Sequence, residues 1–527
     1  MSLARAHGVV ITGVDAHVVE VEAHLSSGLP GMSIVGLADT AVGEARDRVR
    51  AAVLNSGARW PQSRITVGLS PASLHKRGSS LDLAIASAIL AADGQVPAAG
   101  LADTILFAEL GLDGRLRPVR GAVVAAVAAV RAGRDRVVVA PANEAEAGVV
   151  PGVRAVGMAT LRQWGRLLTG LPEEDEPATE PAGRTPVAAL PPGPGRSTAG
   201  PAVPEHVSID LADVRGQPEA VAALEVAAVG GHHVSMVGRP GVGKTMLAQR
   251  LPTILPDLDD DDALTVTAIR SVVADVPGLV RRPPFQAPHH TATVAALVGG
   301  GRGGQPYPGA VTLAHGGVLF LDEAAEFGSA CLEALRQPLE AGVVCIARAG
   351  FTAQLPARFQ LVLAANPCPC GMGDGTGPAC TCRSLDRRRY LARLSGPLMD
   401  RIDVRLALAA PGRAIWSLSQ VGETSAAVRE RVVGARERAV ARALGIGLPP
   451  LLTGSYPGAL LRGPLAPAPE AAELLSAAVA SGRLSARGAD RAIRVAWSLA
   501  DLAGTSRPGV PEVGRALTLR DDGGADG

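Results

Sequence analysis

Eight consecutive residues, 238 to 245, combine glycines with a lysine and a hydroxyl at a spacing suited to phosphate binding. They are Gly238, Arg239, Pro240, Gly241, Val242, Gly243, Lys244 and Thr245. In the pattern G-x-x-x-x-G-K-T, backbone N–H groups curl around phosphate oxygens, the lysine reaches the β- and γ-phosphates, and the hydroxyl ligates Mg²⁺. A strand pattern precedes this stretch and a helix pattern follows it, as the motif requires. The stretch therefore predicts a site for the phosphates of ATP.

Two adjacent acids supply the chemistry that a phosphate site alone lacks. The segment "GGVLFLDE" has the pattern of a buried strand that ends in Asp322 and Glu323. An aspartate in this place suits the magnesium ion, and the glutamate suits polarisation of the attacking water. A strand that ends in two acids is common by itself, but together with Lys244 it predicts ATP hydrolysis.

Four of the six cysteines lie within fifteen residues, as two Cys-x-Cys pairs with glycines between them: Cys368, Cys370, Cys380 and Cys382. Four thiolates can form a closed tetrahedral Zn²⁺ site of the structural kind. The alternative is a set of free or reversibly oxidised thiols. A metal here would stiffen the loop after the strand "FQLVLAAN". Cys331 and Cys345 fall in helix and strand patterns and are predicted to be core residues.

The adjacent His289 and His290 are interpreted as loop residues and not as a second metal site, because neighbouring histidines usually point in different directions. The acidic run 259–262 precedes a helix pattern, where carboxylates meet the positive end of the helix dipole. It requires no ligand.

The elements that must position these residues divide the chain of 527 residues into several units. Residues 1–171 alternate strand and helix patterns and predict an α/β domain. Residues 172–205, rich in Pro, Gly and acids, predict a flexible linker. Residues 206–408 predict an α/β nucleotide-binding domain, 409–510 a helical domain, and 511–527 a disordered tail.

Composition and charge indicate where the protein is located and how strongly it is attracted to nucleic acid. No secretory leader or membrane-spanning stretch is visible, so we expect a cytoplasmic protein without membrane contact. The formal net charge of +1 predicts no general attraction to nucleic acid, so any DNA contact must be local.

The motif series resembles the magnesium-chelatase-like AAA+ ATPases, and most closely the YifB/ComM family. The resemblance is carried by "GLPGMSIVGLADTAVGEARDRVRAA", "FQAPHHTATVAALVGGG", "LAHGGVLFLDE", "LRQPLEAG", "NPCPCG" and "SARGADRAIRVAWSLADL". It implies a Lon-protease-like N-terminal domain (ribosomal S5 domain 2-like), an AAA+ P-loop domain and a C-terminal helical lid. It also implies a homo-oligomeric, hexameric ring whose central pore is lined by an insertion and by a hairpin with Arg348 and Arg358.

The same resemblance assigns roles to three further residues. It implies that Asn366 orients the lytic water and that Arg401 is an arginine finger acting on the neighbouring subunit's nucleotide. Without the resemblance, Arg401 would be interpreted as an ion-pair partner of Asp400 or Asp403. Arg487 is implied to be the sensor arginine of the lid, with Arg491 and Arg494 as neighbours.

The Lon resemblance raises the question of peptidase chemistry. Lys76, Gly78 and Ser80 match the lysine, glycine and nucleophilic serine of the Lon pattern, but the downstream lysine that would activate the serine is replaced by Val123. We therefore interpret this domain as inactive, with a structural or partner-binding role toward a protein not identified by the sequence.

Three functions follow, in order of preference. The resemblance implies a DNA translocase that drives branch migration in recombination or natural transformation, acting on branched or single-stranded DNA. The second is the ATPase subunit of a magnesium chelatase, which remodels a metal-insertion partner. The third is a regulatory scaffold that hydrolyses ATP slowly.

Overall fold

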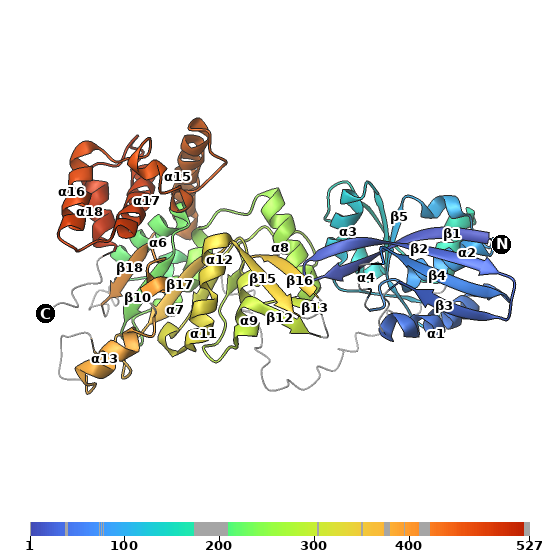
Figure 1. The fold of residues 1–527 in the computed structure, drawn as a ribbon. Coiled ribbons are helices and arrows are strands. Elements are labelled where there is room, and N and C mark those ends of the chain that lie inside the picture. Colours follow the sequence, from blue (N-terminus) through green and yellow to red (C-terminus); the bar gives the residue numbers. More distant parts are fainter. Residues whose placement is uncertain are drawn as a thin grey trace.

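The structure is a computed structural model that describes residues 2–36, 40–72, 74, 76, 78–172, 209–302, 305–348, 351–373, 380–394, 396–409 and 422–520. It forms an elongated arrangement, with the N-terminal domain at one end, a parallel-sheet domain in the middle and C-terminal helices at the other end (Figure 1). The predicted linker 172–205 lies, except for residue 172, outside the described residues.

The N-terminal domain is built on a seven-stranded mixed sheet in the order β3-β4-β2-β1-β5-β8-β9. Alternating burial along β2 shows that one face of the sheet packs on the core. Its strands are β1 (Ser2–Thr12), β2 (Asp15–Ser26), β3 (Gly31–Val35), β4 (Arg64–Ser70), β5 (Thr104–Phe107), β8 (Arg136–Val139) and β9 (Arg154–Gly157), with a small hairpin of β6 (Glu109–Leu110) and β7 (Leu116–Arg117). Its helices are α1 (Thr40–Asn55), α2 (Asp82–Ala92), α3 (Ala122–Arg131), α4 (Pro141–Ala147) and α5 (Leu161–Thr169).

The central domain contains a five-stranded parallel sheet in the order β11-β14-β17-β10-β18. The uniformly buried runs "VLFL" and "QLVLAA" in its middle are typical of parallel strands covered on both faces. The strands are β10 (Val234–Gly238), β11 (Phe285–Gln286), β14 (Val318–Leu321), β17 (Gln360–Ala365) and β18 (Val404–Leu408). The helices are α6 (Pro218–Gly230), α7 (Lys244–Ile254), α8 (Asp260–Val273), α9 (Val294–Val298), α10 (Ala310–Leu313), α11 (Ser329–Ala334), α12 (Arg336–Ala341), α13 (Ser384–Leu391) and α14 (Gly396–Met399).

Two antiparallel hairpins accompany this sheet: β12 (Gly299–Arg302) with β13 (Gln305–Pro308), and β15 (Val343–Arg348) with β16 (Phe351–Pro356). The acidic run begins α8 as predicted, since the side chain of Asp259 accepts the Asp262 backbone N–H. Cys331 is buried as expected, but Cys345 is exposed because it lies on the outward face of β15.

The C-terminal domain consists of α15 (Ser425–Gly445), α16 (Pro469–Ala480), α17 (Ala486–Ala503) and α18 (Val510–Thr518). The predicted disorder from residue 511 is wrong for residues 511–520, because α18 buries Val513 and Ala516 against the core. Residues 521–527 lie outside the described part of the chain.

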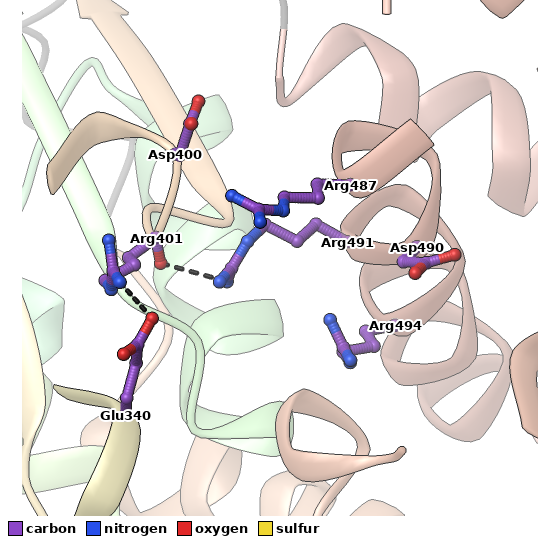
Figure 2. Close-up of a pocket in the computed structure, with 7 residues that line it drawn as sticks. All are labelled: Glu340, Asp400, Arg401, Arg487, Asp490, Arg491 and Arg494. Carbon is purple, nitrogen blue, oxygen red and sulfur yellow. Dashed lines mark hydrogen bonds and ion pairs between the residues drawn. The ribbon is translucent and has the colours of Figure 1, made fainter. Parts of the chain in front are cut away.

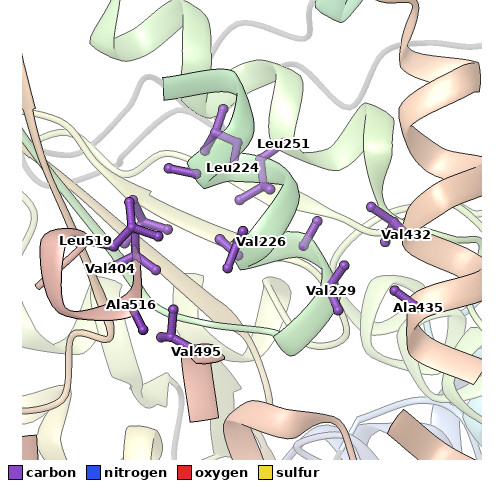
Figure 3. Packing of buried hydrophobic residues seen from close by; sticks show 14 of the residues in the cluster. Leu224, Val226, Val229, Leu251, Val404, Val432, Ala435, Val495, Ala516 and Leu519 are labelled. Carbon is purple, nitrogen blue, oxygen red and sulfur yellow. The ribbon is translucent and has the colours of Figure 1, made fainter. Parts of the chain in front are cut away.

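One hydrophobic core joins the C-terminal helices to the sheet domain. In Figure 3, Leu224, Val226 and Val229 of α6 face side chains from α15, α17 and α18, and β18 contributes Val404. The helical domain is therefore packed firmly on the sheet and does not stand apart from it.

A second contact joins the N-terminal domain to α8. The backbone N–H of Gly121 donates to the Ser271 carbonyl at 2.9 Å, and the buried Ser271 hydroxyl contacts Glu146 at 2.5 Å. Burial raises the pKa of Glu146. Val123 donates its backbone N–H to the Ser271 hydroxyl, so the position that a Lon lysine would occupy is part of this contact.

Within the described residues, no helix is both long and apolar enough to cross a membrane.

Candidate active site and metal centre

The phosphate loop lies where the sequence predicts it, between the end of β10 and the start of α7. Gly241 and Gly243 have positive φ values of 80° and 94°, which disfavour any residue with a side chain. A Cβ on Gly238 would lie 2.8 Å from the Leu408 carbonyl oxygen, so this position also requires glycine. Arg239, Pro240 and Val242 complete the loop, which opens toward the first turn of α7.

Lys244 and Asn366 meet in this loop from two neighbouring strands. The Lys244 ammonium donates to Asn366 Oδ1 at 2.9 Å and to the carbonyl oxygens of Gly238 and Arg239 at 2.6 and 3.1 Å. Burial lowers the pKa of Lys244, while the charges of Asp322 and Glu323 act in the opposite direction. The Lys244 ammonium thus occupies the loop, where it is bonded to backbone carbonyl oxygens. Phosphate oxygens can replace these carbonyls as its acceptors.

Thr245 and Asp322 also lie side by side, since the threonine hydroxyl donates to Asp322 Oδ2 at 2.7 Å. This pair of oxygens is suited to a hard divalent cation such as Mg²⁺. Asp322 Oδ1 in turn accepts the Glu323 backbone N–H at 2.9 Å. The two acids at the end of β14 therefore have different partners: Asp322 faces the threonine, and Glu323 faces a histidine.

Glu323 is held in an unusual backbone conformation. Among the described residues it is the only non-glycine with a left-handed φ, 51°. Such a conformation persists only when its surroundings hold it, and it is frequent at functional sites. Its carboxylate contacts His290 Nδ1 at 3.1 Å.

The contact with His290 is the functional feature that sequence reasoning missed. The two histidines lie in the loop between β11 and α9, as interpreted, and their rings are 4.1 Å apart. Only His290 reaches the acid, whereas His289 contacts the Thr291 hydroxyl at 2.8 Å. No short motif in the sequence signals this contact, because the pairing of β11 with β14 creates it.

The four clustered cysteines come together as predicted. Their sulfur atoms all lie within 4.8 Å of one another, and Cys368 is 3.3 Å from Cys370 and 3.8 Å from Cys380; the fourth member is Cys382. Tetrahedral Zn²⁺ with Zn–S bonds of about 2.3 Å requires S···S separations near 3.8 Å. A backbone hydrogen bond at Met372 is the main cause that lowers the pKa of Cys370 to about 6. The donor set and its spacing therefore fit a structural zinc site.

The cysteine loop also supports the phosphate loop. Gly371 has a φ of 79°, and a Cβ on it would lie 2.8 Å from the ring of Pro240. Its backbone N–H donates to the Cys368 carbonyl at 2.9 Å. Because Asn366 lies two residues before Cys368, the cysteine cluster can fix both the asparagine and one wall of the loop.

The two remaining predicted residues, Arg401 and Arg487, line a separate pocket of about 270 Å³ (Figure 2). Arg401 is paired with Glu340, which differs from the predicted alternative partners Asp400 and Asp403. Arg487 is exposed and makes no hydrogen bond or ion pair with the described residues. The other residues that line the pocket are Glu340, Asp400, Asp490, Arg491 and Arg494.

This pocket lies at the opposite end of the strands from the phosphate loop. Strands β10 and β18 run parallel with Val234 opposite Val404, and Gly238 opposite Leu408. The phosphate loop follows Gly238, whereas Arg401 precedes Val404. An arginine at the start of β18 therefore cannot reach the phosphates bound in its own chain.

A buried polar network fixes the pocket to the sheet. Asp403 contacts His232 at 3.2 Å and accepts a hydrogen bond from Arg491 of α17 at 2.6 Å. Burial by itself would raise the pKa of Asp403, but the His232 contact and the charge of Arg491 hold it well below its usual range. His232 also contacts the Ser498 hydroxyl at 2.8 Å. Helix α17 is therefore bonded to the start of β18 through Arg491 and to the segment before β10 through Ser498.

The Lon-like residues form no comparable assembly. The Ser80 hydroxyl donates to the Val9 carbonyl at 2.9 Å, and the Lys76 ammonium donates to the Pro71 carbonyl. Among the described residues, the two side chains are thus bonded to different backbone carbonyls and not to each other.

Comparison with known proteins gives matches along almost the whole chain. Three family models match: subunit ChlI of Mg-chelatase over residues 21–143, magnesium chelatase subunit ChlI over 210–414, and its C-terminal part over 422–520. An uncharacterized protein of Mycobacterium tuberculosis is 48% identical over 99% of both chains. YifB of Escherichia coli is 43% identical over 83% of this chain and 82% of its own, and competence protein ComM of Haemophilus influenzae is 42% identical over 84% of each.

A shorter match extends to the Lon proteases. The archaeal Lon protease of Archaeoglobus fulgidus is 43% identical over 68 residues, which are 13% of this chain. Together with the mixed α/β structure, these matches fit an AAA+ α/β fold of the magnesium-chelatase type with Lon-like similarity.

Proposed function

Since the chain belongs to the YifB/ComM family of magnesium-chelatase-like AAA+ proteins, we propose that it is an ATP-hydrolysing motor that forms a ring and moves on DNA. The observation that carries the ATPase part is the meeting of Lys244, Thr245, Asp322 and Asn366 at one edge of the parallel sheet. Ligands bind at this edge in open α/β sheets.

Each side chain has a distinct role in the proposed reaction. The loop N–H groups and Lys244 hold the phosphates, and Thr245 and Asp322 hold Mg²⁺, which when bound would neutralise charge on the phosphate oxygens. Glu323 accepts a proton from the attacking water, and Asn366 orients that water once Lys244 has moved from it to the phosphates. Phosphate positioning and charge stabilisation are the main demands of this chemistry.

The placement of the arginines supports an oligomer. Arg401 and Arg487 share one pocket, which lies at the end of the strands remote from the phosphate loop of the same chain. Arg401 is the proposed finger and Arg487 the proposed sensor, and both would serve the nucleotide of an adjacent subunit. A head-to-tail contact of this kind closes into a ring, for which we propose six subunits.

The DNA part of the proposal rests on the relatives. The Haemophilus influenzae relative is named a competence protein, which supports a role in handling DNA during transformation. We propose branch migration of recombination intermediates as the activity. The Lon-like domain, residues 1–171, would then be an inactive domain that binds a protein partner.

A structural Zn²⁺ at the four cysteines completes the proposal. The ion would hold the loop that carries Asn366 and presses on Pro240. It would have no catalytic step of its own, because all four ligand positions are taken by cysteine.

The experiment that tests the function is ATP hydrolysis by the purified protein with and without forked or four-way-junction DNA, with Lys244→Ala as the blank. We expect hydrolysis that DNA stimulates and that the variant lacks. Hydrolysis indifferent to DNA would contradict the translocase and direct attention to protein partners of the N-terminal domain.

A second candidate is favoured by the family models, which bear the name of a magnesium chelatase subunit. Such an ATPase would remodel a partner that inserts metal into a porphyrin. Strand displacement on forked DNA, measured beside porphyrin metallation with added partner subunits, separates the two functions. A slow regulatory ATPase would show neither activity.

A further inference from the structure

Helix α13 bears arginines that neither the phosphate site nor the arginine pocket uses. The helix follows the cysteine cluster directly, with Arg383 as its N-cap residue. Arg383, Arg388 and Arg389 are exposed, and we refer to these three as the α13 arginines. Arg387, half-buried, adds a fourth positive charge within seven residues.

These charges are not compensated within the described residues. None of the four arginines has an ion pair there, and the one acid of the helix, Asp386, makes none either. Arg393, just beyond the helix, differs because it pairs with Glu326 at 3.1 Å. Four positive charges within seven residues repel one another, so an anionic ligand would stabilise this surface.

The α13 arginines are held on a firm support. Tyr390 and Leu394, 3% and 7% exposed, anchor the helix in the hydrophobic core that includes β17 and α14. Cys380 and Cys382 tie its start to the cysteine cluster. Figure 1 shows α13 projecting from the body of the central domain, away from the sheet. A rigid, projecting cationic helix is suited to contact a large ligand and not a small one in a cavity.

We propose that the α13 arginines form a binding surface for the phosphate backbone of DNA. This inference rests on the proposed DNA function and names a surface for it, outside the insertion and the hairpin that the family resemblance places at a central pore. Because the whole chain has a net charge of +1, its attraction to a polyanion must come from such a local cluster. Guanidinium groups bind phosphates without reading sequence, which is what a translocating motor requires.

The test uses the full-length protein and a fluorescently labelled duplex of arbitrary sequence. The variant carries Arg383→Gln, Arg388→Gln and Arg389→Gln. A matched control carries the same change at Arg50, Arg117 and Arg154, which are exposed, lie in the N-terminal domain and have no ion pairs among the described residues. Circular dichroism and melting temperature check that both variants are folded.

Binding is measured as a function of salt concentration. Each lost phosphate contact reduces the slope of log K against log salt by about 0.9, so the α13 variant should lose about 2 to 3 in slope and about 100- to 1,000-fold in affinity near 0.1 M salt. The control variant should match the wild type in slope.

Each other outcome would overturn the proposal in a recognisable way. If the wild type binds DNA and the α13 variant keeps its slope, the surface is wrong but the DNA function stands. If that variant instead loses binding to polyglutamate alone, the ligand is an acidic polypeptide. If the wild type does not bind DNA while its ATP hydrolysis is intact, the proposed DNA function fails, and this inference with it.

Discussion

Substitution of Arg401 by alanine tests whether two subunits build one active site. The register of β10 and β18 places Val404 and Leu408 about 13 Å apart along the strands at about 3.3 Å per residue, and Arg401 lies three residues farther from the loop. An effect of Arg401→Ala on hydrolysis therefore has to act across a subunit boundary. Arginine fingers accelerate phosphoryl transfer by about 10³- to 10⁵-fold, so we expect a loss of at least about 10³-fold in kcat.

The decisive assay mixes two inactive variants. Lys244→Ala lacks a phosphate lysine but retains Arg401, and Arg401→Ala has the opposite defect. In a randomly mixed ring with head-to-tail interfaces, about one interface in four unites an intact lysine with an intact arginine. An equimolar mixture should thus recover about a quarter of the wild-type rate, and the doubly substituted protein should recover nothing when it is mixed with either variant.

The reasoning would be refuted if the mixture stayed inactive although both variants bind ATP and exchange subunits. It would also be refuted if Arg401→Ala hydrolysed ATP at the wild-type rate. Repeating the mixture with Arg487→Ala tells whether the lid arginine acts from the same side of the boundary, as their shared pocket predicts (Figure 2).

Three further predictions follow from single contacts. Because His290 positions the Glu323 carboxylate, His290→Ala should lower kcat about 10-fold with little change in KM; His290→Asn, which keeps a donor at the Nδ1 position, should recover part of the rate, and His289→Ala should leave it unchanged. Cys380→Ser should abolish stoichiometric zinc, measured by mass spectrometry of the metal, and lower the melting temperature, whereas zinc-free wild-type protein with unchanged stability would contradict a structural ion. Burial and the charge of Arg358 lower the pKa of His315 to about 4 in the folded protein, against 6.5 in the unfolded chain, so stability should be lost as the pH falls from 6.5 toward 4. At pH 5 this amounts to about 2 kcal/mol, and denaturant titrations of His315→Asn should show a correspondingly smaller loss.

Local motifs made the geometry of the proposed phosphate site predictable from the sequence. Lys244, Thr245 and Asp322 belong to short patterns in which the spacing alone fixes the geometry, and the structure brings them within hydrogen-bonding distance. The assignment of Asn366 came from the family resemblance, and its position directly after the buried strand β17 agrees with it. The cysteine cluster was predictable because the glycines between its pairs allow the chain to turn back.

Contacts between distant segments were not predictable in this way. His290 and Glu323 are brought together by the pairing of β11 with β14, which is visible only in the folded sheet. Most of helix α18 falls in the segment 511–527 that the sequence predicts to be disordered. It is a helix because Val513 and Ala516 gain their stability from burial against the core and not from local propensity.

The pairing of β10 with β18 connects the phosphate loop, at one end of the strands, with the arginine pocket at the other end. β10 ends at the phosphate loop, and β18 begins beside Asp403, which holds Arg491 of α17 and the histidine that precedes β10. A shift of β10 caused by phosphate binding would therefore be passed through these buried contacts to the arginines of the pocket at the other end of the strands. Because packed cores change between discrete arrangements and do not deform continuously, the arginines would move as one unit with the lid. The state of a subunit's own nucleotide would in this way set the position of the arginines that it presents to its neighbour.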